Sequence, residues 1–481
     1  MSILRISFKR GSLNLVSNKV VLIFVLVLSC CGTLLANEFV SDTLELRSVQ
    51  IVGNGRTKDS YILRELSVSL GEKMPQALMD KAVERSRQNI FNLNLFNAVE
   101  LEKSIDEGFL DLKIVVKERL YLLPLPIFFL ADRSFNEWWY DRERDFKRTT
   151  YGIQMNHSNL SGNGDELRVK AYAGFIPYVE MSYNRPYIDK RQRMGLRGGL
   201  FFSTQKTLAY RTWNDKLDFY NTEKRMRERK GAYVEYNLRN ALYHFHKVYL
   251  GVTGMSISDS IVDINPNYFG DNGKNLNYFS LSYEYRMDKR DNFQYPLKGQ
   301  VFQARITKYG LGVFKDANQL DVNTVFVKYI PLSNAFFADL GFRGKVSFPK
   351  LQLYPFVQGL GYRNNLVRGY QLNVIDGQNY GLITSNLKWK VFEKQFDFSK
   401  FLKIKQFNTI PIATFVKFFG DVGYVQNFFP ELSNSTLSNK VLWGGGIGAD
   451  IVTYYNTALD INYSVNQFGS SKFFFTVRRG L

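Results

Sequence analysis

The sequence predicts a mainly β protein, in which an antiparallel transmembrane β-barrel follows one small α+β domain. Three observations support this fold class. Apolar and polar residues alternate in one segment after another from residue 151 to residue 481. Short turns and long polar loops alternate between these segments, which is typical of an outer-membrane barrel. The chain also begins with the pattern of an export signal.

Residues 1–36 have the features of a secretory signal peptide. Basic residues precede an apolar run from Val20 to Leu28, and Ala36 offers a small residue for cleavage. The run is too short for a membrane helix, which needs about 20 residues. A signal anchor and a lipidated N-terminus are the alternatives. Both cysteines, Cys30 and Cys31, lie in this segment, so the mature chain is expected to have no disulfide, thiol nucleophile or Cys-ligated metal.

Composition and charge agree with an exported barrel. The net charge is +19, and four of the positive charges lie in the signal segment. Export argues against a nucleic-acid partner, so we expect a basic lumen or basic loops beside anionic lipid. Aromatic residues make up 15% of the chain, while the mean hydropathy is only −0.22. A barrel combines these properties, because lipid-facing residues alternate with polar lumenal ones.

Residues 44–118 predict a small domain of order β-α-α-β-β. A strand at 46–52 ends in a glycine-rich turn, and Thr57 can cap the short helix that follows. Pro75 suits the first residue of a second helix. Two more strands, at 97–103 and 110–116, flank the turn Asp106-Glu107-Gly108.

Residues 149–481 predict the barrel itself. Within 281–287, for example, apolar and polar residues alternate at every position. A soluble β-sandwich shows the same alternation, but the abundance of Tyr and Phe and the long loops, such as residues 205–230, favour the barrel. Residues 119–148 are interpreted as a linker that brings the chain to the periplasmic rim. Its tryptophan pair, Trp138 and Trp139, would lie near the lipid headgroups, or else in an ordinary exposed loop.

Several motifs resemble one known family. Residues 44–118 resemble a polypeptide-transport-associated (POTRA) domain, through Val-Gly-Asn-Gly at 52–55, Leu-Phe-Asn-Ala-Val at 95–99 and Val-Val-Lys-Glu at 115–118. In the barrel, Val367-Arg368-Gly369-Tyr370 resembles the Val-Arg-Gly-aromatic motif of the BamA/TamA superfamily, which includes two-partner-secretion transporters and bacterial surface antigens. The segment 419–423, Phe-Gly-Asp-Val-Gly, resembles the family's Phe-x-Asp-x-Gly strand motif. The resemblance covers almost all of the mature chain.

The resemblance implies a 16-stranded barrel in which Val367, Arg368, Gly369 and Tyr370 lie in the sixth extracellular loop, between strands 11 and 12. This loop would fold into the lumen, where Arg368 would pair with Asp421. The strand candidates that follow Arg368 fit the count if eleven strands precede it: 380–391, 414–426, 441–452, 457–466 and 472–478. A guanidinium drawn into a barrel needs a desolvated partner, and bidentate carboxylate pairing suits arginine. The alternative is an ordinary surface arginine.

The glycine-rich segment 444–448 follows no phosphate-binding spacing. Its small residues are expected to let neighbouring groups approach the barrel wall closely. Signs of an enzyme are few. Ser347 and Lys350 match Ser-x-x-Lys without its companion motifs. His244 and His246 share one strand face, where a solvated pair is favoured over a metal site. We therefore assign no catalytic, cofactor-binding or metal-binding residue.

The family resemblance implies an outer-membrane factor for protein assembly or translocation. Its POTRA domain would receive unfolded clients in the periplasm, and the barrel or its lateral seam would insert or export them. The implied partners are outer-membrane lipids including lipopolysaccharide, unfolded outer-membrane or secreted clients, and periplasmic or lipoprotein accessory subunits, with no nucleic acid. The chain departs from BamA in having room for one POTRA domain and in ending in Leu481. The competing class is a passive porin-like or surface-exposed binding barrel.

Overall fold

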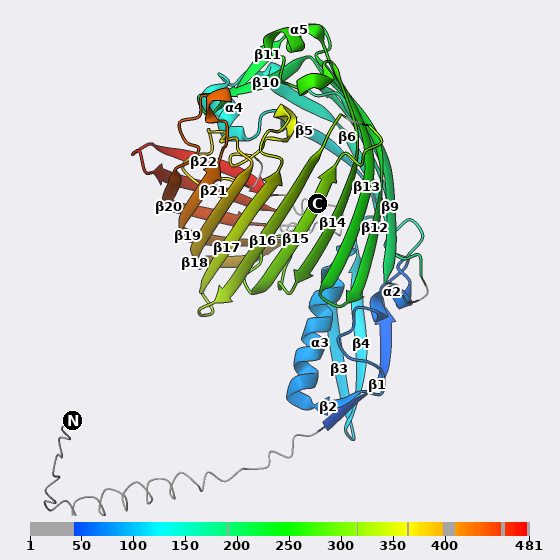
Figure 1. Cartoon of the computed structure of the whole chain (residues 1–481). Coiled ribbons are helices and arrows are strands. Elements are labelled where there is room, and N and C mark those ends of the chain that lie inside the picture. The colour runs from blue at the N-terminus through cyan, green and yellow to red at the C-terminus, as the bar shows by residue number, and fades with distance from the viewer. Residues whose placement is uncertain are drawn as a thin grey trace, which may run out of the picture.

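The computed structural model describes residues 43–189, 191, 193–314, 316–362, 365–397, 409–453 and 457–478. The predicted signal peptide lies outside the described residues. Figure 1 shows two parts, a small α+β unit in blue and a large sheet that curls round on itself, coloured from cyan to red.

The small unit is built on a four-stranded sheet with the strand order β2-β1-β4-β3. Its elements in chain order are β1 (Thr43–Val52), α2 (Asp59–Leu63), β2 (Lys73–Pro75), α3 (Gln76–Phe91), β3 (Phe96–Asp106) and β4 (Phe109–Glu118). β1 runs parallel to β4, whereas the β3–β4 and β1–β2 pairs are antiparallel. The two helices and the sheet share one core, which includes Leu46, Ile62 and Met79. The predicted α+β domain is confirmed, with the three-residue strand β2 as an addition.

Two local predictions in this unit are corrected by one residue each, and one is confirmed. The N-cap of α2 is Lys58, because the hydroxyl of Thr57 instead donates to Glu118 Oε1 at 2.6 Å. Pro75 is the N-cap of α3 rather than its first residue. The β3–β4 hairpin turns at Glu107 and Gly108, which have φ values of +47° and +84°. Two successive positive φ values are the geometry of a tight hairpin.

The large sheet has sixteen antiparallel strands, which confirms the predicted strand count. They follow one another in chain order, apart from the separate hairpin of β10 (Thr207–Trp213) and β11 (Lys216–Asn221). The sixteen are β5 (Leu122–Leu130), β6 (Thr149–Ser158), β7 (Glu166–Gly174), β8 (Tyr178–Arg185), β9 (Met194–Gln205), β12 (Arg227–Ala241), β13 (His244–Ile257), β14 (Asn275–Asp288), β15 (Gly299–Tyr309), β16 (Gln319–Pro331), β17 (Phe336–Phe348), β18 (Asn379–Asp397), β19 (Thr409–Gln426), β20 (Val441–Val452), β21 (Ala458–Asn466) and β22 (Ser471–Arg478).

The interpretation of residues 119–148 as a linker is wrong, because β5 is the first strand of the sheet. Pro124 and Pro126 concealed it, since proline is excluded from all but the edges of sheets. The rest of the segment joins β5 to β6 and contains α4 (Phe135–Asp141), which lies at the end of the barrel away from the small unit (Figure 1). Trp138 and Trp139 therefore lie at the opposite end from the one predicted. Residues 205–230, expected to be a loop, contain the β10–β11 hairpin.

The two faces of the barrel wall differ as they would in lipid. On β19, the outward Phe418 is 60% exposed, whereas the inward Lys417 and Asp421 are 1% and 2% exposed. A soluble sandwich would turn its apolar face inward, so this pattern favours a barrel that faces lipid. Among the described helices, none has both the length and the apolar composition needed to span a membrane.

Candidate functional site

The loop that carries the Val-Arg-Gly-Tyr motif connects β17 to β18, which are the eleventh and twelfth strands of the barrel. We call its described part, residues 349–362 and 365–378, the sixth loop. The loop folds back on itself, since Leu360 and Ile375 exchange two backbone hydrogen bonds. Val367 and Tyr370 are almost fully buried in an apolar cluster with both of these residues and with side chains of β18, β19 and β20.

The structure brings Arg368 and Asp421 together inside the barrel. Arg368 Nε donates to Asp421 Oδ2 at 2.7 Å, and Nη2 donates to the other carboxylate oxygen. The backbone N–H of Arg368 also donates to Asp421 Oδ2, at 3.0 Å. The carboxylate thus accepts a bidentate pair and a backbone bond, which fixes both the side chain and the backbone of the loop.

Each inward residue of the Phe-x-Asp-x-Gly motif on β19 contacts the sixth loop. The guanidinium carbon of Arg368 lies 4.0 Å from the centre of the Phe419 ring. A Cβ at Gly423 would lie 2.5 Å from Val367 Cγ2, so the glycine makes room for the loop. The period of two residues places all three motif side chains on one face of the strand. The motif is therefore the part of the wall against which the loop packs.

The glycine-rich segment of β20 makes room for the loop in the same way. A Cβ at Gly444 would lie 2.0 Å from the backbone oxygen of Arg368, a separation that atoms do not tolerate. Gly369 has a φ of +99°, which only glycine adopts without strain, and its carbonyl accepts a bond from Asn466 at 3.0 Å. The expectation that small residues in 444–448 permit close approach to the wall is confirmed at Gly444.

Sequence reasoning missed the polar groups that surround this pair. Arg368 Nη1 donates to Asn386 Oδ1 at 2.5 Å, and Asn386 in turn donates to Asp339 at 2.6 Å. Asp339 pairs with Lys388 at 2.9 Å. A second buried group lies nearby, where the ammonium of Lys417 contacts Asp450 and Asp460 at 2.7 and 2.8 Å. Inward-facing charges on adjacent strands were visible in the sequence, but their partners depend on the strand register.

A second segment of chain, α4, holds the sixth loop from the other side. Arg133, just before α4, donates to the carbonyl oxygens of Gly361, Asn373 and Leu372 at 2.6, 3.1 and 3.3 Å. Its Nε also pairs with Glu137 at 2.8 Å. Burial alone would raise the pKa of Glu137, but the charges of Arg133 and Arg142 hold it below its ordinary value. Glu137 is therefore a buried anion that fixes Arg133.

A buried carboxyl group lies at the base of the sixth loop. Burial raises the pKa of Asp376 to about 6, although a hydrogen bond from the Tyr362 hydroxyl, 2.6 Å long, opposes the rise. Beside the loop, a cavity of about 1040 Å³ is lined by Arg368, Asp421 and Lys417 among others. The loop and the inner wall thus border a cavity, lined in part by charged groups, that is large enough to hold water.

The first and last strands of the barrel meet at a seam without a described ladder between them, since β5 and β22 are the two ends of the strand order. The Tyr121 carbonyl and the Ala131 N–H both form backbone hydrogen bonds on the β6 side. The backbone N–H and C=O groups of every odd-numbered residue between them therefore point toward β6. The even residues face the seam, and two of these are Pro124 and Pro126. Proline has no N–H group, so this edge of β5 lacks two of its donors.

α4 occupies the opposite edge of the seam, on β22. Asn136 Nδ2 donates to the carbonyl of Phe475 at 3.2 Å, and the N–H of Phe475 donates back to Asn136 Oδ1 at 2.9 Å. The hydroxyl of Tyr140 donates to the carbonyl of Phe473 at 3.1 Å. Asn136 is 1% exposed. A side-chain amide thus takes the two backbone bonds that a neighbouring strand would take.

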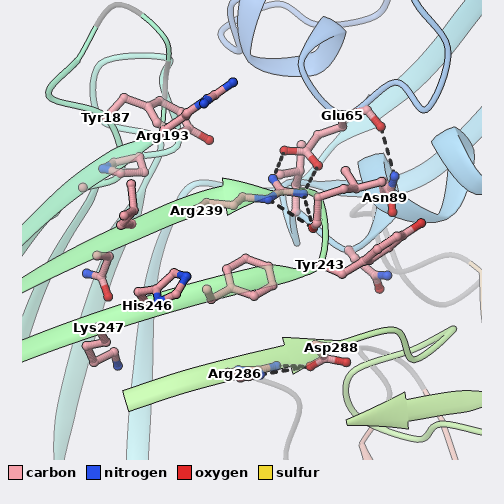
Figure 2. Close-up of a pocket in the computed structure, with 18 of the residues that line it drawn as sticks. Glu65, Asn89, Tyr187, Arg193, Arg239, Tyr243, His246, Lys247, Arg286 and Asp288 are labelled. Carbon is pink, nitrogen blue, oxygen red and sulfur yellow. Dashed lines mark hydrogen bonds and ion pairs between the residues drawn. The ribbon is translucent and has the colours of Figure 1, made fainter. Parts of the chain in front are cut away.

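Figure 2 shows the joint between the small unit and the barrel, where side chains from α3 and from the barrel strands line one pocket. Glu65 bridges the two parts, because both of its oxygens accept from the guanidinium of Arg239 on β12, at 2.8 and 3.2 Å. Arg85 of α3 donates to the Tyr243 hydroxyl at 2.9 Å. The cavity they line is about 470 Å³ in volume. These contacts fix the direction in which the small unit projects from the barrel.

Comparisons with known proteins agree with this architecture. Residues 44–119 match the POTRA family model, described as a surface antigen variable number repeat. The structure is similar to that of BamA from Haemophilus ducreyi lacking POTRA domains 1–3, with 16% identity, a TM-score of 0.52, and coverage of 90% of this chain and 84% of that chain. It is also similar to CdiB from Escherichia coli, with 12% identity, a TM-score of 0.52, and coverage of 90% and 75%. No curated protein sequence matches the chain.

The fold and the comparisons together define a class, a 16-stranded antiparallel barrel preceded by a POTRA domain. The predicted resemblance to the BamA/TamA superfamily is confirmed by the POTRA match and by the barrel fold shared with BamA and CdiB. At these identities, the likeness to solved structures concerns the fold alone.

Proposed function

We propose that the chain is an outer-membrane factor for protein assembly or translocation. Its POTRA domain, residues 44–118, receives unfolded clients in the periplasm, and the barrel, residues 122–478, inserts them through its seam or exports them through its lumen. The partners are outer-membrane lipids including lipopolysaccharide, the clients, and periplasmic or lipoprotein accessory subunits. The protein performs no bond-breaking chemistry in this scheme.

The observation that carries this proposal is the seam. A passive barrel is most stable when its first and last strands are paired, because closure satisfies every backbone group in lipid. In this barrel, Pro124 and Pro126 remove two donors from one edge, and the other edge is bonded to side chains of α4. A seam built in this way favours a barrel that exchanges partners at this edge over a passive pore.

The POTRA domain supplies a second edge. β3 ends the sheet order on one side, so its outer edge has no neighbouring strand within the described residues. An extended polypeptide can add to such an edge through backbone bonds, whatever its sequence. The Glu65–Arg239 bridge holds this sheet at the mouth of the barrel, which supports transfer from one edge to the other.

Depletion of the protein in its native host tests the proposal. Loss of many barrels from the outer membrane would indicate insertion, and loss of one secreted protein would indicate export. The deletion of residues 44–118 should leave an inserted barrel that cannot restore either process. An outer-membrane proteome and secretome unchanged by depletion would refute the proposal in favour of a porin-like or surface-binding barrel.

A further inference from the structure

α4 and the residues just before it contact both structures that a client would have to pass. Arg133 bonds three carbonyls of the sixth loop, while Asn136 and Tyr140 bond the backbone of β22. These residues lie within eight positions of one another, on a segment that connects β5 to β6. The same short segment therefore follows the strand at one edge of the seam, contacts the other edge on β22 and bonds the lumenal loop.

The contact with β22 uses backbone groups that have no other strand beside them in the part of the chain that the structure describes. Because Phe475 bonds Asn136 through both its N–H and its carbonyl, its backbone faces away from β21. Residues two positions away share this direction, and the Phe473 carbonyl indeed accepts from Tyr140. The bonded stretch Phe473–Phe475 is thus the middle of the free edge of β22. A strand that paired there would need the same atoms.

We propose that α4 is a latch on the last strand, which must release Phe473 and Phe475 before an extended client segment can pair with β22. This proposal rests on the proposed function and adds that α4 controls access of a client to the edge of β22. The occupant of the released edge is an extended polypeptide with free backbone donors. β5 cannot replace it fully, since Pro124 and Pro126 leave two β22 acceptors without partners.

The contacts around α4 hold the helix on β22 but are few enough for a competing strand to replace them. Phe135 stacks edge-on against Phe475 with ring centres 6.0 Å apart, and Ser134 caps the helix by accepting from Glu137 N–H at 3.2 Å. Two amide bonds and one hydroxyl bond hold the helix to β22. A strand that paired with the same backbone groups would form bonds of the same kind and more of them, so it can displace these three.

The absence of cysteine from residues 43–481 allows a direct test. The full mature chain carrying Val477→Cys, next to the latched stretch, is reconstituted in lipid vesicles. The probe is a peptide with the sequence of residues 122–130, in which both prolines are replaced by valine and a terminal cysteine follows a glycine spacer. The matched control peptide keeps the prolines. Disulfide formation between the probe and the thiol introduced by Val477→Cys reports pairing with β22.

Asn136→Ala should raise the trapping of the valine peptide roughly thirtyfold, because two hydrogen bonds to β22 are lost. Tyr140→Phe, which removes one bond and keeps the ring, should raise it severalfold, and the proline peptide should be trapped less well in every variant. Asn434→Ala is the matched control, since its amide bonds Asn214 in another loop. A shift in gel mobility on heating, which is typical of a folded outer-membrane barrel, checks that each variant is folded. If Asn136→Ala does not fold, Tyr140→Phe still tests the latch.

Equal trapping in Asn136→Ala and in the chain that keeps Asn136 would refute the latch proposal. An absence of trapping in all variants would also refute it. The measurement needs no insertion or export activity. A trapping series that behaves as expected, together with an unchanged proteome on depletion, would refute the proposed function and leave the latch intact.

Discussion

The ion pair between Arg368 and Asp421 can be tested by a double-mutant cycle. Arg368→Ala removes the bonds to Asp421, Asn386 and Ser385, and leaves the buried carboxylate with the backbone N–H of residue 368. Breaking a buried pair costs about 3–5 kcal/mol when both groups are dry. The adjoining cavity of about 1040 Å³ can admit water, which lowers the expected cost to about 2–3 kcal/mol.

Asp421→Ala leaves a guanidinium that keeps Asn386 and Ser385 as acceptors, so its cost should be no larger. The double variant removes both charges and should cost about 2 kcal/mol less than the sum of the single changes. That coupling corresponds to roughly a thirtyfold effect on the opening equilibrium of the sixth loop.

Hydrogen exchange of residues 365–378 in the reconstituted barrel measures this opening directly. Arg305→Ala serves as the control, because it breaks a different lumenal ion pair, to Glu284, on β14 and β15. Loop exchange should rise in both single variants, rise in the double variant by about thirtyfold less than the two single effects combined, and stay unchanged in the control. Strictly additive effects would refute the reasoning, as would unchanged loop exchange in Arg368→Ala.

Three further predictions follow from the same contacts. Because burial raises the pKa of Asp376 from 3.8 to about 6, the folded loop holds its proton more tightly than the open loop and loses about 3 kcal/mol as pH rises through this range. Asp376→Asn should abolish the resulting rise in protease sensitivity between pH 4 and pH 7. Gly444→Ala should expose the loop to protease, since a Cβ there meets the loop carbonyl, whereas Gly381→Ala, with open space around it, should not. Arg239→Ala should loosen the POTRA domain, read as a broader range of spin-label distances to the barrel, while Glu65 keeps its ion pair with Arg64. An unchanged range of distances would contradict this prediction.

The sequence predicted those elements whose signals are local. The strands after Arg368 were predicted to within one residue at most of their ends, because each carries its own alternation and ends at polar turns. The exceptions are the end of β18, six residues later than predicted, and the start of β19, five residues earlier. The hairpin turn at Glu107-Gly108 was likewise visible, since such turns require residues that tolerate positive φ. Local patterns suffice where the bilayer or the core imposes one periodicity.

The seam could not be predicted in this way. β5 contains two prolines, which count against a strand unless it is known to be an edge, and edges are a property of the closed sheet. The contact between Asn136 and Phe475 spans 339 positions of sequence, and a single asparagine in a short helix carries no sign of it. The Arg368–Asp421 pairing came from family resemblance together with the chemistry of guanidinium and carboxylate. Its extension through Asn386 to Asp339 required the register of β17 and β18.

The contacts of Arg133 with the sixth loop and of Asn136 with β22 connect the lumen of the barrel to its seam. Arg133, just before α4, is fixed by Glu137 in the first turn of the helix, and Asn136 is the residue that immediately precedes Glu137. A rigid turn of helix therefore connects the carbonyls of the sixth loop to the backbone of β22. Movement of the sixth loop away from Asp421 would pull on Arg133, and displacement of Asn136 by a client strand would disturb the same turn. If clients open the seam as proposed, the contacts of Arg133 and Asn136 would transmit that change to the sixth loop.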